Sequence, residues 1–244
     1  MKPATDRERL IATVATLLDG VRHVAVGASS PIPAAAAMLR RALDQGRREV
    51  RISILGSARH NFFTNGSAEL FDCAAQGRID AFFLGGGQID GEGNINLVGA
   101  GAYPRSSPRW PGSFGSGLLY YVVPRVILFR EEHSPRVLVE KVDFVSAAGA
   151  SPPQVRRSGG PHALVTSLAL FRFDRERRRF VLARLHPEHG VEDIRARTGF
   201  SFDCAADLAP APDPDAETLA LIRGRVLDEL GEAYPRFVEA FRAT

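Results

Sequence analysis

The stretch Ile79-Asp80-Ala81-Phe82-Phe83-Leu84, followed directly by Gly85-Gly86-Gly87, indicates the fold class of this chain. It is almost wholly apolar and lacks the alternation of apolar and polar residues that a half-solvated strand shows. Strands of this kind are buried on both faces, which is typical of a parallel sheet covered by helices. The glycines would then lie at the carboxyl end of a strand, where open α/β sheets place their ligands.

Helical patterns alternate with further short strand patterns before this stretch. Residues 21–26 and 50–55 predict strands because they are short, apolar and rich in β-branched residues. The predicted helices follow the capping box Thr5–Glu8, the prolines Pro31 and Pro33 (with Ser29 or Ser30 as cap), and Ser67. This alternation predicts an α/β fold with an open, mostly parallel, Rossmann-like sheet covered by helices.

The sequence after Leu84 is rich in glycine, and the sheet is expected to continue through it. Short apolar stretches that predict further strands are 95–98, 118–123, 126–129, 137–139 and 142–145. Residues 163–173 and 180–185 predict a hairpin with a charged turn, and 191–198 predict a short helix. Asp215 is expected to cap a last amphipathic helix of about 16 residues. We expect one domain, 1–244, on which the C-terminal helical segment 215–243 packs.

The composition excludes several classes of protein. The chain has 244 residues, of which 45% are hydrophobic and 24% charged, which are ordinary values for a globular protein. Its net charge of +3 does not suit a polynucleotide-binding protein, although small phosphorylated ligands would fit it. Cys73 and Cys204 are too few for a disulfide framework or a Cys-built zinc site. No apolar run approaches the roughly 18 residues of a membrane span, and the polar N-terminus lacks a secretory segment. We therefore expect a cytoplasmic protein that binds neither nucleic acid nor membranes.

Polar candidates follow the predicted strand 50–55. His60 could act as an acid, a base or a hydrogen-bond donor, with Arg59 and Asn61 beside it. The alternative is that all three are ordinary loop residues. The other histidines show no metal-ligand spacing, so no metal site is expected.

The glycine-rich segments are the second set of candidates. Gly85-Gly86-Gly87-Gln88 matches neither the dinucleotide-binding nor the P-loop spacing, and a tight hairpin-like turn is the simpler interpretation. In Ser113-Phe114-Gly115, successive backbone N–H groups could form an oxyanion or phosphate nest. A flexible surface loop is the alternative for this segment.

Four segments together resemble the second, beta-type chain of the family I CoA-transferases, the group of the glutaconate and 3-oxoacid CoA-transferases. Residues 82–96, FFLGGGQIDGEGNIN, resemble the family's LGALQVDxxGNxN segment, and 111–117, PGSFGSG, stand where the family has a glycine loop. Residues 165–171, VTSLALF, resemble VTDLAVF, and 186–200, HPEHGVEDIRARTGF, resemble hPGvtveeVraaTGF. Each segment alone is weak evidence, whereas four in the right order are fairly specific.

This resemblance implies the CoA-transferase fold, to which the fold of the sugar-phosphate isomerases is related. It also implies an alpha-type partner chain, in a heterodimer or heterotetramer, and an acyl-CoA substrate with no cofactor. CoA-binding contacts are then expected from Gly85 to Gln88, from Ser113 to Gly115 and from Asn61. His60 and Arg59 are the catalytic candidates.

One departure from the family pattern bears on the reaction. Transferase members attack acyl-CoA with a glutamate after the strand equivalent to 50–55, but here residues 54–60, ILGSARH, contain no glutamate. The early Gly-x-Gly-x-Pro loop is also altered, to GASSP at 27–31. These departures resemble the branch whose paired chains hydrolytically open rings on CoA-linked intermediates of steroid breakdown, where the partner can supply the glutamate. CoA transfer and a non-catalytic chain that completes an interface site are the alternatives.

Overall fold

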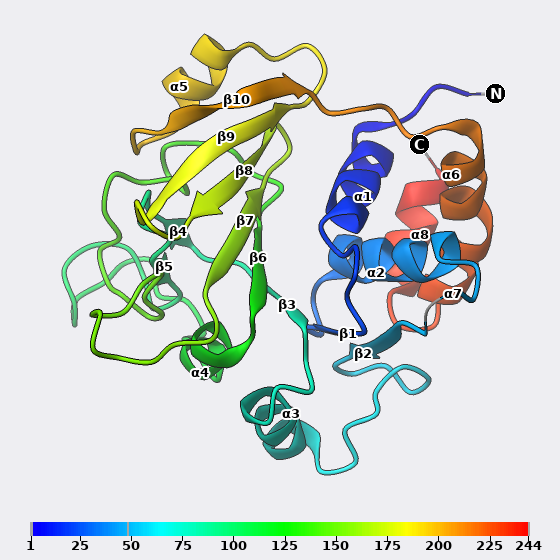
Figure 1. Cartoon of the computed structure of the whole chain (residues 1–244), viewed down its shortest axis with the longest axis horizontal. Coiled ribbons are helices and arrows are strands. Elements are labelled where there is room, and N and C mark those ends of the chain that lie inside the picture. The colour runs from blue at the N-terminus through cyan, green and yellow to red at the C-terminus, as the bar shows by residue number, and fades with distance from the viewer. Residues whose placement is uncertain (1, 48, 244) are drawn as a thin grey trace. The chain divides into compact units, whose positions relative to one another are not determined.

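The computed structural model describes residues 2–47 and 49–243, and the chain divides into two compact units. The first unit combines Met1–Phe83 with Pro212–Thr244, and the second is Leu84–Ala211. Figure 1 labels the helices and strands of both. No helix among the described residues is long and apolar enough to cross a membrane.

Three parallel strands form the sheet of the first unit, in the order β2-β1-β3. They are β1 (His23–Val26), β2 (Arg51–Ile54) and β3 (Ala81–Leu84). Every residue of β1 and β3 is buried, as predicted for strands covered on both faces. Because the strands are parallel, their carboxyl ends share one edge of the sheet and their amino ends share the other.

The helices of this unit come from both ends of the chain. They are α1 (Asp6–Thr16), α2 (Pro31–Leu43), α3 (Gly66–Ala75), α6 (Ala216–Leu221), a π-helical turn (Ile222–Val226), α7 (Leu227–Leu230) and α8 (Pro235–Arg242). The C-terminal helices, orange to red in Figure 1, pack against the blue helix α2. The last helical segment is therefore interrupted by a π turn instead of being one regular helix.

Local capping explains where these helices begin. The predicted capping box is confirmed: Thr5 Oγ1 accepts from the Glu8 N–H at 3.3 Å, and Glu8 accepts from the Thr5 N–H at 2.8 Å. Glu8 also binds Arg223 of the π turn at 2.6 Å, which joins the first helix to the C-terminal segment. Asp215 caps α6 through the Thr218 N–H, as predicted.

The second unit contains a mixed sheet in which β6 to β10 lie side by side in chain order. The parallel pairs are β6 (Arg125–Phe129) with β7 (Pro161–Val165) and β9 (Arg179–Leu185) with β10 (Asp203–Pro210). Antiparallel pairing joins β7, β8 (Ala169–Asp174) and β9. With the parallel sheet of the first unit, this confirms an α/β fold with mostly parallel pairing.

Two short elements and two helices complete this unit. The strands β4 (Gln88–Ile89) and β5 (Ile95–Asn96) form the predicted hairpin-like turn, and the helices are α4 (Ser116–Val122) and α5 (Val191–Arg197). The helix at 191–198 is thus confirmed. A cluster of edge-to-face rings fills the core beneath the sheet, made of Phe171, Phe180, Phe200 and Phe202.

Several strand predictions for this unit are wrong. Residues 118–123 form helix α4, in which Tyr120 is fully buried and donates to the Gly93 carbonyl at 2.7 Å. An apolar run this short does not distinguish helix from strand by its periodicity. Residues 137–139 and 142–145 form no strand, and Leu138 makes only an isolated bridge to Ile89.

Two further strands differ in length from the prediction. The expected strand 95–98 is confined to the two residues of β5. The expected long strand 163–173 is broken at Thr166, whose Oγ1 accepts the N–H groups of Leu168 and Ala169 and so makes a turn. Its two halves, β7 and β8, therefore pair with each other, while the predicted charged hairpin turn joins β8 to β9.

Candidate functional site

The loop after β2, which holds His60, folds back tightly on the carboxyl end of its strand. The Ile54 N–H donates to the His60 carbonyl at 2.7 Å, and the Ser57 N–H donates to the Ile54 carbonyl at 3.1 Å. The buried Ser57 hydroxyl accepts from the N–H groups of Arg59 at 3.2 Å and His60 at 2.9 Å. The loop therefore presents His60 from a fixed backbone.

Two carboxylates of the C-terminal segment reach this loop from the far end of the chain. Glu232 accepts from the Ser57 hydroxyl at 2.6 Å and from the Ala58 N–H at 2.8 Å, one bond to each oxygen. These hydrogen bonds, that of Ser57 foremost, hold the pKa of Glu232 below its usual value. Tyr234 donates to the carbonyl of Gly27 in the loop after β1 at 3.1 Å. The segment thus joins the loops of two neighbouring strands.

Glu229 lies against the His60 ring. His60 Nε2 is buried 3.1 Å from Glu229 Oε1, at ion-pair distance although without the alignment of a hydrogen bond. Arg41 of α2 pairs with the same carboxylate oxygen. Nδ1 of His60 makes no hydrogen bond to the described residues and is left for water or a ligand. We call Ser57, Ala58, His60, Glu229 and Glu232 the carboxyl-edge cluster.

The neighbours of His60 differ in what they can contribute. Arg59 is exposed, and its guanidinium has no ion pair within residues 2–47 and 49–243. Asn61 Oδ1 accepts from the Phe63 N–H at 3.2 Å and so shapes the next turn. Arg59 is therefore available to an anionic ligand, whereas Asn61 is partly engaged by its own backbone.

The glycines at 85–87 and Gln88 lie in the second unit, where packing accounts for much of their identity. A Cβ on Gly86 would lie 2.7 Å from the Gln88 carbonyl, and one on Gly87 would lie 2.3 Å from the Trp110 ring. Gln88 donates to Asp143 at 2.7 Å and accepts from Asn96 at 2.8 Å. Gly85 is looser, since its Cβ would meet the Phe129 carbonyl at 3.3 Å.

The second candidate loop presents an exposed ring. Phe114 is 82% exposed and has a positive φ of 44°, an unusual conformation for a large residue. Ser113 accepts from the Ser116 N–H at 2.8 Å, and Gly115 precedes the first residue of α4. The loop is thus ordered, with its aromatic side chain directed into solvent.

The structure brings some predicted site residues together and adds others. Arg59, His60 and Asn61 share one loop of the first unit, while Gly85 to Gln88 and Ser113 to Gly115 occupy separate loops of the second. Sequence reasoning missed Glu229, Glu232 and Tyr234, because no local pattern marks residues that bind a loop more than 170 positions away. Within the described ranges, no group of three or more His, Cys, Asp or Glu side chains could hold a metal ion.

Comparison with known proteins identifies the family. The model of the coenzyme A transferase family matches residues 47–197, more than half of the chain and including the loop of the carboxyl-edge cluster. The chain belongs to the coenzyme A transferase family. The resemblance seen in the four sequence segments is therefore confirmed.

Its relatives differ in their named activities. The second of the named subunits of the glutaconate CoA-transferase from Acidaminococcus fermentans is 31% identical over 160 residues, covering 62% of this chain and 58% of that protein. The cholesterol ring-cleaving hydrolase IpdB subunit of Rhodococcus jostii is 30% identical over 164 residues, covering 66% and 64%. These alignments thus span less than two thirds of the relatives' own lengths.

A solved structure shows the likeness over nearly the whole chain. The decarboxylase AibA/AibB superimposes with a TM-score of 0.75 and 25% identity, over 93% of this chain and 98% of that one. This supports the CoA-transferase fold for both units. Members similar to this chain thus include a named transferase, a hydrolase and a decarboxylase.

Proposed function

We propose that this chain is the beta-type component of a two-chain enzyme that acts on an acyl-CoA thioester. The reaction is hydrolytic carbon–carbon ring opening of a CoA-linked intermediate of steroid degradation. Similarity to the ring-cleaving hydrolase supports this reaction, and similarity to one of the paired chains of a CoA-transferase supports an alpha-type partner. We propose the cytoplasm as its location.

The observation that carries this proposal is the state of the loop after β2. Residues 54–60 contain no glutamate, and the carboxylate that does reach Ala58, Glu232, has both oxygens occupied and a lowered pKa. A nucleophilic carboxylate must approach the thioester carbonyl, which this clamped group does not favour. Covalent transfer through this chain is therefore disfavoured relative to hydrolysis.

His60 is our candidate for the base. Glu229 beside Nε2 favours the tautomer with the proton on that nitrogen, which leaves Nδ1 free to accept a proton from water. The resulting hydroxide adds to a ring ketone β to the thioester. The bond between that carbon and the α carbon then breaks, its electron pair forms the thioester enolate, and the enolate takes up a proton. Water is consumed, and one carboxylate and one intact thioester result.

The test is turnover by the pair co-expressed with its alpha-type chain. The probe is 2-oxocyclohexanecarboxyl-CoA in ¹⁸O-labelled water, with acetate present as a possible CoA acceptor. Hydrolysis predicts pimeloyl-CoA with one ¹⁸O in its free carboxylate and no acetyl-CoA. An open-chain product without label, or no ring opening of this probe or of a bicyclic homologue, would overturn the proposal.

CoA transfer is the second candidate, favoured by the similarity to the glutaconate CoA-transferase chain. It predicts acetyl-CoA formation, and a borohydride-reducible thioester on a glutamate of one chain, detectable by mass spectrometry. A modified residue on this chain would make transfer the leading function. A non-catalytic role for this chain instead predicts that substitution of His60 leaves turnover of the pair unchanged.

A further inference from the structure

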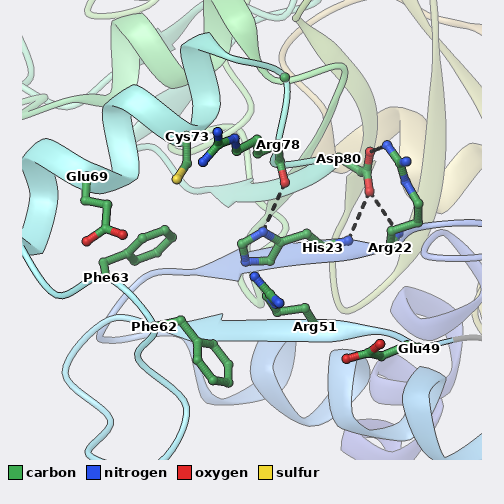
Figure 2. Close-up of a pocket in the computed structure, with 11 residues that line it drawn as sticks. Arg22, His23, Glu49, Arg51, Phe62, Phe63, Glu69, Cys73, Arg78 and Asp80 are labelled. Atoms are coloured by element: carbon green, nitrogen blue, oxygen red, sulfur yellow. Dashed lines mark hydrogen bonds and ion pairs between the residues drawn. The ribbon is translucent and has the colours of Figure 1, made fainter.

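A pocket of about 560 Å³ opens at the amino edge of the first unit's sheet (Figure 2). His23 begins β1 and Arg51 begins β2, and Phe62, Phe63 and the segment around Arg78 complete its walls. The carboxyl-edge cluster follows the opposite ends of these strands. We call this cavity the amino-edge pocket; its volume is in the range of small-molecule sites.

Two of its carboxylates are already committed to neighbouring groups. Asp80 accepts from the N–H groups of Arg22 at 2.9 Å and His23 at 3.0 Å and pairs with the Arg22 guanidinium. Burial alone would raise the pKa of Asp80, but these bonds hold it below its usual value. Glu69 Oε2 accepts from Thr64 and from the backbone of Asn65, which leaves Oε1 without a hydrogen bond among the described residues.

Two guanidinium groups in the pocket have no such partner. Within the part of the chain that the structure describes, neither Arg51 nor Arg78 has a carboxylate at ion-pair distance. Figure 2 shows both side chains beside the His23 ring, while Glu49 lies at the far side of the view. Planar guanidinium groups bind phosphate and carboxylate oxygens through paired hydrogen bonds. An anion entering here would meet two unpaired cations.

His23 is a neutral, fixed wall between them. Its Nδ1 lies 3.0 Å from the Arg78 carbonyl and its Nε2 lies 2.8 Å from the Ser53 hydroxyl. A carbonyl only accepts, so Nδ1 holds the proton and Nε2 accepts from Ser53. Burial first, and the charge of Arg51 in addition, lower the pKa of His23, although its bond to Arg78 opposes them.

Aromatic side chains provide a surface for a planar ring. Phe63 stacks on His23 with ring centroids 6.1 Å apart and planes inclined by 26°. Phe62 is 51% exposed, with the Arg51 guanidinium 5.6 Å from its ring centre. Exposed rings of this size at a pocket mouth suit stacking on a planar ligand.

We propose that the amino-edge pocket binds an adenine nucleotide. Arg51 and Arg78 would hold the phosphate, Phe62 would stack on the base, and the unoccupied Oε1 of Glu69 would accept from the exocyclic amino group. This site is independent of the proposed reaction. Its ligand can be a free nucleotide or the nucleotide end of CoA, which have the same recognition chemistry.

The test is isothermal titration of the purified full-length chain with AMP, adenosine, inorganic phosphate and CoA as separate probes. AMP is expected to bind at least about tenfold more tightly than adenosine or phosphate, because each lacks half of the contacts. Arg51→Gln and Arg78→Gln should each weaken AMP binding about tenfold or more, the scale of a lost charged hydrogen bond. Arg236→Gln, at an exposed arginine of the same unit outside the pocket, should leave binding unchanged.

The CoA arm distinguishes the two sources of nucleotide. Binding of CoA that is tighter than that of AMP and equally sensitive to Arg51→Gln identifies the CoA end, and binding of AMP alone identifies a free nucleotide. In either case the pKa of His23, followed by NMR, should rise when the ligand binds, because an anion stabilises its protonated form. Equal binding of AMP and phosphate, no binding of AMP or CoA at about 10 mM, or insensitivity to both substitutions would overturn the proposal.

Discussion

The two edges of the β2-β1-β3 sheet solve the problem of placing polar groups in different ways. At the carboxyl edge, Glu229 and Glu232 arrive from the C-terminal segment and partner His60, Ser57 and Ala58. At the amino edge, the carboxylates are held by neighbouring groups while two arginines have no carboxylate partner among the described residues. The first arrangement fixes a loop, and the second leaves charge available for a ligand.

This difference separates positioning from recognition. Hydrogen bonds that occupy both oxygens of a carboxylate keep it ionised and immobile, which suits a brace better than a reacting group. An unpaired guanidinium on a solvated rim costs little and gains much when an anion arrives. The two edges should therefore respond differently to substitution and to pH.

The largest expected effect is at His60. In the co-expressed pair, His60→Gln should lower turnover by about a hundredfold or more, the usual loss when a general base is removed. His189→Gln is the matched control, because that ring pairs with Asp193 of α5 and does not belong to the carboxyl-edge cluster. Steady-state kinetics on both variants checks this, and a His60 variant with more than half the original turnover would contradict it.

Next in size is the brace between the loop and the C-terminal segment. Ser57→Ala removes the buried hydroxyl that serves Glu232, Arg59 and His60, and should lower the free energy of unfolding by about 1 to 2 kcal/mol. Ser29→Ala, in the exposed loop after β1, should change it little. Urea denaturation of both variants provides the measurement, and equal stabilities would show that the brace is not needed.

A smaller effect concerns acid. Because the pKa of Glu232 is lower in the folded chain, its contribution to stability is fully present above the unfolded value near 4.5 and is lost as the pH falls through the folded value. The difference in urea midpoint between the wild type and Glu232→Gln should be constant from about pH 7 to 5.5 and shrink below about 4.5. A difference that grows with acid would reverse the assigned direction.

The smallest effect belongs to His23 at the amino edge. Its pKa is lowered in the folded chain, so the unfolded chain binds the proton first when the pH drops below about 6.5. Stability should therefore fall between about pH 7 and 5 by an increment that His23→Asn lacks. Melting temperatures of both proteins across this range test the sign, and parallel curves would contradict it.

Much of the fold could be predicted because burial leaves a local record. The unbroken apolar character of 79–84 predicted a strand covered on both faces, and Thr5 with Glu8 predicted a helix start. The same reasoning failed at 118–123, because a short apolar run next to glycines suits helix or strand equally. It also failed at Thr166, where one hydroxyl turns the chain between two apolar strands.

The candidate site divides along the same line. The sequence by itself determined the family, the loop that holds His60 and the missing glutamate, since each is a property of consecutive residues. Only the tertiary structure decided which groups meet that loop: Glu232 reaches Ala58 across 174 positions of chain. It also showed that Arg51 and Arg78 share a pocket in which neither pairs with a described carboxylate. Such pairings depend on the path of the chain through space, which no local periodicity encodes.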